Sequence, residues 1–320
     1  MTAVLALEDG RIFRGEAYGA RGEGLGEAVF ATGMTGYQET LTDPSYHRQI
    51  VVQTAPQIGN TGWNDEDDES GSIQVAGYVV RDPARTPSNW RSQRSLDDAL
   101  GAQGVVAVAG IDTRALVRHL RERGAMRAGV FSGDALAPDD ELVQRVLASP
   151  PMEGADLYGA VTTRQPYVVP AQGPRRFRVA ALDVGIKSNT PRMLAARGIE
   201  VHVLPAETPI EEVEELAPDG FFLSNGPGDP ATAASTFRSS STPPGGSRSH
   251  RRTTGSPWPA RRVSGSTPRS AVPRSPTPAR TTGASRGCGP STSRRSACST
   301  TRRPRPARTT PRTSSTGSSS

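Results

Sequence analysis

Two glycines just after an apolar run are the first candidates for chemistry in this sequence. The run Phe221–Ser224 leads directly into a loop from Asn225 to Pro230, which contains Gly226 and Gly228. A short apolar run without alternation is typical of a strand buried on both faces. Glycine lets another molecule approach the main chain closely, and open parallel sheets bind ligands at the carboxyl ends of their strands. The loop is therefore predicted to hold a ligand, and a simple tight turn is the alternative interpretation.

The charge of the chain is divided between an acidic body and a basic tail. The whole chain has 320 residues and a net charge of +6. Residues 236–320 contain 17 Arg and no Lys, Asp or Glu, so the first 235 residues carry the other 21 of the 38 basic residues and all 32 acidic ones, a net charge of −11. The tail has few large apolar side chains, so it cannot bury a core that offsets the entropy of ordering it. We predict a low-complexity, disordered tail over 236–320.

Both cysteines, Cys288 and Cys298, lie in the tail and have no metal-ligand spacing with a nearby histidine. The body has no cysteine for a disulfide. The first ten residues lack the basic start and long apolar core of a signal peptide, and no run of about 18 apolar residues occurs. These features predict a cytoplasmic protein without a transmembrane helix or a metal site.

Residues 1–150 have the pattern of a β-rich domain with a few helices. The expected strands are Ala3–Leu7, Arg11–Glu16, Ala28–Ala31, Gln49–Thr54, Gln74–Val80 and Val105–Ala109. A helix is expected to begin at Asp112 or Thr113 and to end at Gly124, with His119 packed on its inner face. Asp139–Leu147 is expected to be a short helix. The acidic stretch Asn64–Glu69 resembles a calcium loop only in composition, so we interpret it as a solvated loop.

Residues 151–176 are rich in proline and are predicted to be a linker. From Phe177 the pattern changes to strand, helix, strand, helix, strand, which is the beginning of a parallel α/β sheet. Thr190 is expected to cap the first helix, and Thr208-Pro209-Ile210-Glu211 is expected to form a capping box for the second. The sheet has three predicted strands when low complexity begins, so residues 177–235 are predicted to be an incomplete domain.

Several motifs together resemble the small subunits of carbamoyl-phosphate synthases. They are Met34-Thr35-Gly36-Tyr37-Gln38-Glu39, Leu41-Thr42-Asp43-Pro44-Ser45-Tyr46, Ile111-Asp112-Thr113-Arg114, Asp183-Val184-Gly185-Ile186-Lys187 and Leu223-Ser224-Asn225-Gly226-Pro227-Gly228-Asp229-Pro230. The last motif is shared more loosely by other class I glutamine amidotransferases. The resemblance runs from residue 1 to about 234. It implies an α/β protein: a β-rich N-terminal small-subunit domain followed by a truncated, flavodoxin-like class I amidotransferase domain.

The resemblance also implies a function. Such small subunits hydrolyse L-glutamine and pass ammonia to a large subunit, which uses bicarbonate and ATP with Mg²⁺ to make carbamoyl phosphate for arginine and pyrimidine biosynthesis. The expected partners are therefore the large subunit and glutamine. No cofactor is expected in this subunit, which has no Walker-type phosphate loop.

The resemblance assigns part of a glutamine site. Gly226 and Gly228 correspond to the family's glutamine-binding glycines, Gly228 contributes to the oxyanion hole, and Ser45 reaches the glutamine from the N-terminal domain. The family's nucleophilic Cys and its His and Glu have no counterparts in this reading frame: Cys288 lacks the surrounding motif, and His250 is followed by two arginines. No catalytic residue is nominated, and the 320-residue chain is predicted to lack glutaminase activity.

A frameshift near residue 235, together with some missing sequence, is our hypothesis for the tail. Residues 297–303 can be back-translated with GC-rich codons and regrouped by one base to give Val-Gln-Tyr-His-Pro-Glu, the kind of sequence the family has around its catalytic His and Glu. Residues 304–316 continue in the same way.

Two alternative functions stay open at this point. The chain could be a non-catalytic partner that docks on the large subunit through its N-terminal domain. It could also bind nucleic acid through the arginine-rich tail, although the tail has little of the aromatic interleaving expected for base stacking.

Overall fold

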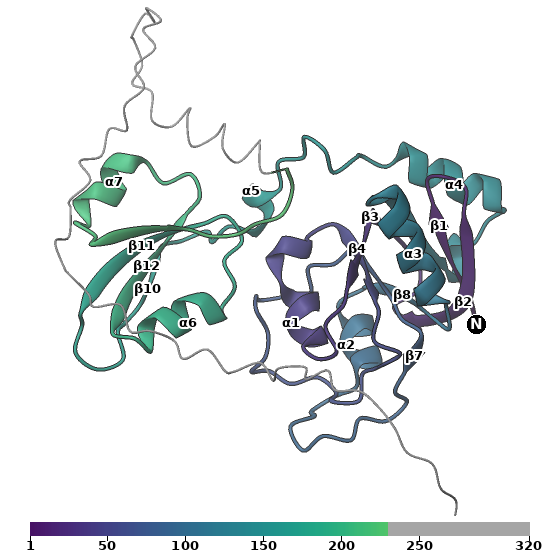
Figure 1. The fold of residues 1–320 in the computed structure, drawn as a ribbon, viewed down its shortest axis with the longest axis horizontal. Helices are drawn as coiled ribbons and strands as arrows, with labels where there is room; N and C mark the ends of the chain where they lie inside the picture. The colour runs from purple at the N-terminus through teal and green to yellow at the C-terminus, as the bar shows by residue number, and fades with distance from the viewer. Residues whose placement is uncertain (230–320) are drawn as a thin grey trace, which may run out of the picture. The chain divides into compact units, whose positions relative to one another are not determined.

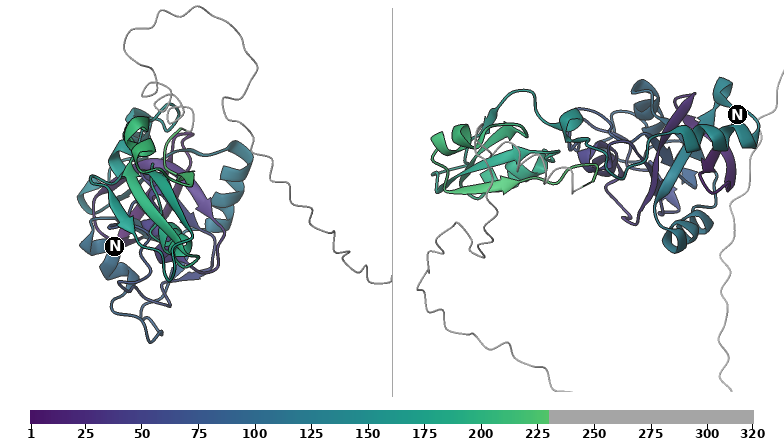
Figure 2. Two further views of the ribbon diagram at one scale, coloured as in Figure 1. Left: turned by 90° about the vertical axis from the view of Figure 1, so that its left-hand side faces the viewer. Right: turned by 90° about the horizontal axis from the view of Figure 1, so that it is seen from above.

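A computed structural model describes residues 1–229 of the chain (Figure 1). The predicted tail, both cysteines, His250 and the proposed frameshift lie outside these described residues. The described residues form a β-barrel domain, followed by a second group of strands and helices that begins near Tyr158. Figure 2 shows the ribbon from the side and from above.

Seven strands of the first domain form a closed barrel in the order β1-β2-β8-β6-β4-β3-β9. Their bounds are β1 Thr2–Leu7, β2 Ile12–Gly19, β3 Glu23–Ala31, β4 Gln49–Gln53, β6 Gly77–Val79, β8 Val106–Ala109 and β9 Met126–Ser132. Two short strands, β5 Gln57–Ile58 and β7 Asp82–Pro83, pair separately. Closure of the barrel by β1 and β9 leaves no open edge, which removes a common route to aggregation.

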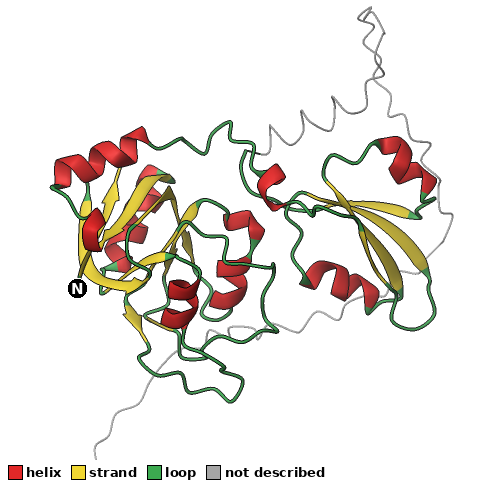
Figure 3. Cartoon of the chain, turned by 180° about the vertical axis from the view of Figure 1, so that it is seen from behind, coloured by secondary structure: helices red, strands yellow, loops and turns green. Residues whose placement is uncertain are grey.

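Helices lie outside the barrel strands (Figure 3). They are α1 Tyr37–Thr42, α2 Leu96–Ala102, α3 Thr113–Arg123 and α4 Asp139–Ala148, with single 3₁₀ turns at Pro44–Tyr46 and Gly133–Ala135. Alternate residues along β1 divide between two cores: Leu5 and Leu7 pack in a cluster with Leu116 of α3, whereas Val4 and Ala6 pack with Leu142 of α4. A third cluster joins the barrel to α1 and α2. The period-2 alternation of the strands thus positions the helices.

The predicted end signals of α3 are confirmed. Asp112 caps the helix, because its Oδ1 accepts a hydrogen bond from the N–H of Ala115 at 3.0 Å. Gly124 follows the last residue with a positive φ of 94°. The side chain of His119 is largely buried, and its Nε2 lies 2.6 Å from Asp9 Oδ2, so this histidine has the packing role expected from its position.

The second group of elements contains one more strand than the sequence predicts. Its sheet has the order β10-β12-β11-β13. The bounds are β10 Tyr167–Val169, β11 Phe177–Asp183, β12 Ile199–Pro205 and β13 Gly220–Leu223, with helices α5 Tyr158–Val161, α6 Asn189–Ala195 and α7 Ile210–Glu215. β10 runs antiparallel to β12 and lies inside the predicted linker. The proline-rich stretch 151–176 is therefore partly structured.

Helices α6 and α7 cover opposite faces of this sheet (Figure 1). Ala181 packs with Leu194 on the α6 side, and its neighbour Ala180 packs with Val213 on the α7 side. Among the described residues, β13 pairs only with β11, and Phe221 is 53% exposed. The sheet is thus incomplete on this side within residues 1–229, as the sequence predicts.

Two predicted helix caps are wrong. Thr190 lies inside α6, which begins at Asn189 without a side-chain cap. Thr208 does not form the capping box, because its hydroxyl donates to the carbonyl of Pro205 at 2.8 Å and the N-cap position of α7 is Pro209. At Thr208 a local bond to the preceding turn replaces the expected cap, whereas at Thr190 the helix begins one residue earlier than predicted.

Candidate glutamine site

The glycine loop begins at the carboxyl end of β13, next to the end of the parallel strand β11. The N–H of Ser224 donates to the carbonyl of Leu182 at 3.2 Å, and the buried Ser224 hydroxyl accepts from the N–H of Val184 at 3.0 Å. These bonds join the two strand ends. The ligand edge predicted from the sequence is therefore the edge where this loop lies.

Both loop glycines are required by the packing of the main chain. A Cβ added at Gly226 would overlap the carbonyl oxygen of Val184. Gly228 has a positive φ of 82°, and a Cβ there would stand 2.5 Å from the carbonyl oxygen of Ala155. Within residues 1–229 the N–H groups of Gly226 and Gly228 donate no hydrogen bond, so they are available to an acceptor on a ligand.

The loop is also tied to the start of the predicted linker. The N–H of Asp229 donates to the carbonyl of Ala155 at 3.1 Å, and the Asp229 carboxylate accepts from the N–H of Gly154 at 3.2 Å. These two bonds attach the residue directly after Gly228 to residues 154 and 155.

A second loop, residues 184–187, follows β11 and is organised by Asp183. One oxygen of this buried carboxylate accepts from the N–H groups of Gly185 at 2.8 Å and Ile186 at 2.7 Å. The other accepts from the N–H of Thr163 at 2.8 Å. With all three bonds made, Asp183 serves to fix the loop.

Ser45 is held by an adjacent carboxylate. It lies in the 3₁₀ turn Pro44–Tyr46, and its N–H donates to Asp43 Oδ1 at 2.9 Å. Among the described residues, the Ser45 hydroxyl makes no hydrogen bond. The main chain of Ser45 is thus fixed while its side chain stays available.

An ion pair connects the Ser45 turn to the second loop. Lys187 Nζ lies 2.6 Å from Asp43 Oδ2, and the Asp43 side chain is only 6% exposed. Burial acts to lower the pKa of Lys187, but the hydrogen bond and charge of Asp43 outweigh it and raise this pKa above its ordinary value. Lys187 is therefore a cation that holds Asp43, and with it the turn at Ser45.

Gly185 is the point at which these segments meet. A Cβ placed on Gly185 would stand 3.0 Å from the Cα of Gly226, 3.2 Å from Pro227 and 3.2 Å from Pro44. Ser45 follows Pro44 directly in the chain. The structure therefore brings the Ser45 turn and the first glycine of the loop against the same residue.

A further tie links residue 69 to the start of α6. The carbonyl of Glu69 accepts from the N–H of Ser188 at 2.8 Å, and its carboxylate accepts from the N–H of Asn189 at 2.9 Å. Other carboxylates of the acidic stretch form ion pairs, Asp67 with Arg91 and Asp65 with Arg94. The solvated loop expected for this stretch is therefore held in place by hydrogen bonds and ion pairs.

The histidines of the described residues are engaged in other contacts. His47 lies 3.1 Å from Gln74 Oε1, His119 contacts Asp9, and His202 Nε2 lies 3.0 Å from Glu200 Oε1. Residues 1–229 contain no cysteine. Across that same range, no group of three or more His, Cys, Asp or Glu is placed to hold a metal ion.

Sequence reasoning missed Asp43 and Lys187 as parts of this site. Asp43-Pro44-Ser45 carries the signature of a side-chain-capped turn. Its partner Lys187 is far away in the sequence, so nothing in the local pattern indicates the ion pair.

Comparisons with known proteins match two separate regions of the chain, one containing Ser45 and the other containing Gly226 and Gly228. The profile described as "Carbamoyl-phosphate synthase small chain, CPSase domain" matches residues 5–130, and "Glutamine amidotransferase class-I" matches residues 180–242. The carbamoyl phosphate synthase small chain of Streptomyces coelicolor is 68% identical over 231 residues, which cover 72% of this chain and 61% of that protein. That of Mycobacterium tuberculosis H37Rv is 65% identical over 236 residues, covering 72% of this chain and 63% of the relative.

The chain is similar to carbamoyl phosphate synthase small chains over 72% of its length. It spans about three fifths of the length of the relatives it matches. The first matched region contains Ser45 and the second contains Gly226 and Gly228. No helix among the described residues is long and apolar enough to cross a membrane.

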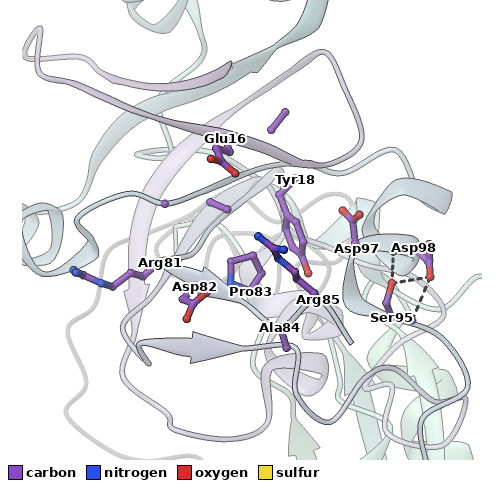
Figure 4. Close-up of a pocket in the computed structure, with 13 residues that line it drawn as sticks. Glu16, Tyr18, Arg81, Asp82, Pro83, Ala84, Arg85, Ser95, Asp97 and Asp98 are labelled. Carbon is purple, nitrogen blue, oxygen red and sulfur yellow. Dashed lines mark hydrogen bonds between the residues drawn. The ribbon is translucent and has the colours of Figure 1, made fainter. Parts of the chain in front are cut away.

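The barrel domain has a hollow of about 700 Å³ (Figure 4), and Ser45, Gly226 and Gly228 do not line it. Carboxylates and arginines line it, but Asp97 accepts from the N–H of Gly19 at 2.6 Å and Asp98 forms a capping box with Ser95. Burial, with the charge of Asp97, raises the pKa of the Tyr18 hydroxyl. Asp97 and Asp98 thus have structural roles, and this hollow is not the candidate site.

Proposed function

We propose that residues 1–229 are the glutamine-binding part of the ammonia-supplying small chain of a carbamoyl phosphate synthase. The observation that supports this most directly is the meeting of the Ser45 turn and the glycine loop at Gly185. Two parts of the chain that match two different profiles supply the two sides of one site.

The proposed roles follow from the groups that are available. The Ser45 hydroxyl and the N–H of Gly226 bind polar groups of glutamine. The N–H of Gly228 faces the amide carbonyl, whose oxygen becomes negatively charged when a nucleophile adds to it. Hydrolysis then requires a thiolate to attack the carbonyl carbon, a histidine to pass a proton to the departing ammonia, and a carboxylate to orient that histidine. Water must then cleave the resulting thioester to release glutamate.

Residues 1–229 supply the binding groups but no thiol. We therefore propose that the 320-residue chain binds glutamine and does not hydrolyse it. Glutamate release above a protein-free control, abolished by replacing Cys288 or Cys298, would contradict this proposal.

Calorimetry with glutamine tests the binding site directly. Loss of one hydrogen bond from Ser45→Ala should weaken binding roughly 3- to 10-fold. Ser88→Ala is the matched control, because this exposed serine lies outside the site. Absence of glutamine binding, or equal binding by both variants, would refute the assignment.

The proposal extends to a partner and to the reading frame. We propose that the chain docks on a synthase large chain in the cytoplasm, and that ATP and Mg²⁺ bind to that large chain. We also propose that the sequence after residue 235 results from a frameshift with some missing sequence. Nucleotide sequencing from codon 230 onward should reveal a change of frame, whereas an intact frame, or tryptic peptides of the tail in native protein, would contradict it.

A further inference from the structure

Helix α3 carries a row of three arginines on one face. Arg114, Arg118 and Arg121 follow one another at spacings of four and three residues, which places them side by side on a helix. All three are exposed. The hollow that they line has a volume of about 490 Å³ and is completed by Thr54, Thr113 and Val117.

The position of α3 does not depend on this row. Leu116 and Leu120 on its buried side belong to the barrel core, and Asp112 caps its first turn. His119 contacts Asp9 at the end of β1. The arginine face can therefore be changed without removing a contact that holds the helix.

The three guanidinium groups are unneutralised. Within residues 1–229 none of them forms an ion pair or a hydrogen bond, whereas Arg14 pairs with Asp139 and Arg127 pairs with Glu8 in the same domain. Like charges four residues apart on a helix repel one another and destabilise it. Such a row on a body with a net charge of −11 indicates a surface that is complementary to an external anion.

The tail does not offer an occupant for the row, because residues 236–320 contain no Asp or Glu. A second copy of the chain is the alternative occupant, because helix α7 carries the exposed glutamates Glu211, Glu212, Glu214 and Glu215. A dimer of the wild-type chain that is lost when the three arginines are replaced would overturn the choice of partner made below. A nucleic acid would be repelled by the acidic body, and the hollow contains no aromatic side chain for stacking.

We propose that Arg114, Arg118 and Arg121 dock a row of carboxylates on an acidic segment of a partner protein. Guanidinium groups match carboxylates in a two-bond geometry, and the row extends about 10 Å along the helix axis. Carboxylates on consecutive turns of one acidic helix have this spacing. The identification of the partner as the synthase large chain rests on the function proposed above.

The first experiment measures the affinity of the full-length chain for the purified large chain. The test variant replaces the three α3 arginines by serine. The control replaces three other exposed arginines whose side chains form no hydrogen bond or ion pair among the described residues, Arg85, Arg164 and Arg192, and so makes the same change in net charge.

The α3 variant should bind roughly tenfold or more weakly, with a smaller dependence on salt, while the control changes less than about threefold. Equal effects of the two variants would overturn the proposal.

The second experiment separates this surface from the choice of partner. A synthetic helical peptide with Glu at positions i, i+4 and i+7 is titrated into the full-length chain, beside the same peptide with Gln. The Glu peptide should bind the wild-type chain and the control but not the α3 variant. If the large chain does not bind the wild-type chain, the proposed partner is wrong, and the peptide result decides the surface. Equal binding of the Glu and Gln peptides would overturn it.

Discussion

Replacement of Gly228 by alanine tests whether the glycine loop is held against the main chain at Ala155. Gly173 provides a matched control, because its φ of 81° is almost the same as the 82° of Gly228. A Cβ at Gly173 would meet no atom within 4 Å, whereas a Cβ at Gly228 would stand 2.5 Å from the carbonyl oxygen of Ala155. The two substitutions therefore share the backbone penalty and differ in the overlap.

The expected magnitudes follow from that difference. A left-handed backbone costs an L-residue about 1–2 kcal/mol, and this cost applies to both variants. Overpacking typically costs about 1–3 kcal/mol more, and it applies only at Gly228. The same carbonyl accepts the N–H of Asp229 at 3.1 Å, so a shift that relieves the overlap also breaks this bond. The excess corresponds to a roughly 5- to 150-fold increase in local opening.

Hydrogen–deuterium exchange measures this opening in the full-length chain. Peptides covering residues 152–158 and 224–229 should exchange faster in Gly228→Ala than in Gly173→Ala by at least that factor, because the backbone penalty of Gly173→Ala acts on a different loop. Peptides from β8 in the barrel should not change, since they are distant in the fold from either glycine. Equal exchange of the loop peptides in both variants would refute the packing of Gly228 against Ala155.

Three further predictions concern stability and solubility. Lys187→Met leaves the buried Asp43 carboxylate without its cation; because Lys187 is 40% exposed, we expect a loss of about 1–3 kcal/mol in guanidinium unfolding, and an unchanged midpoint would contradict the ion pair. A hydrogen bond from His202, with two arginines, lowers the pKa of Glu200 from 4.5 to about 2, so its stabilising contribution is complete above pH 4.5 and is lost as the pH falls towards 2. Glu200→Gln should abolish that part of the acid dependence of the melting temperature, and identical pH profiles would contradict it. We expect the full-length chain to be poorly soluble, and Phe221→Thr should reduce its light scattering, because Phe221 is exposed on a strand paired on one side within residues 1–229; unchanged scattering would exclude this edge as the cause.

Local patterns were sufficient to predict most strands and the position of the glycine loop after β13. The bounds predicted for β11, Phe177–Asp183, are those observed. Alternate residues of β11 pack against different helices on the two faces of the sheet. Because small or apolar residues occur on both faces, the strand is visible in the sequence as an uninterrupted run of such residues. The parallel order of β11 and β13 then fixes the loop at a ligand edge, which is a consequence of topology and needs no side-chain contact.

Two strands that were missed, β9 and β10, depend on distant partners. β10 has only three residues, in a proline-rich stretch, and it exists because β12 supplies its hydrogen bonds. β9 lies between two other barrel strands, and its pattern is broken by Gly129. The caps predicted at Thr190 and Thr208 are wrong for local reasons. Helix α6 already begins at Asn189, and the Thr208 hydroxyl donates to the nearby carbonyl of Pro205.

The tight packing of the glycine loop is compatible with the ligand site that we propose there. Gly226 packs closely against Val184, and Gly228 against Ala155, because neither glycine has a side chain. The N–H groups of both glycines remain unbonded within residues 1–229. A loop that is fixed by its neighbours and keeps its donors free loses little entropy when it binds a ligand. Gly185 also has little space for a side chain, because its φ of 127° is unfavourable for an L-residue and an added Cβ would stand 3.0 Å from the Cα of Gly226 and 3.2 Å from Pro44. Because Gly185 lies between the Ser45 turn and the glycine loop, the backbone of residues 184–187 sets how closely these two segments approach each other.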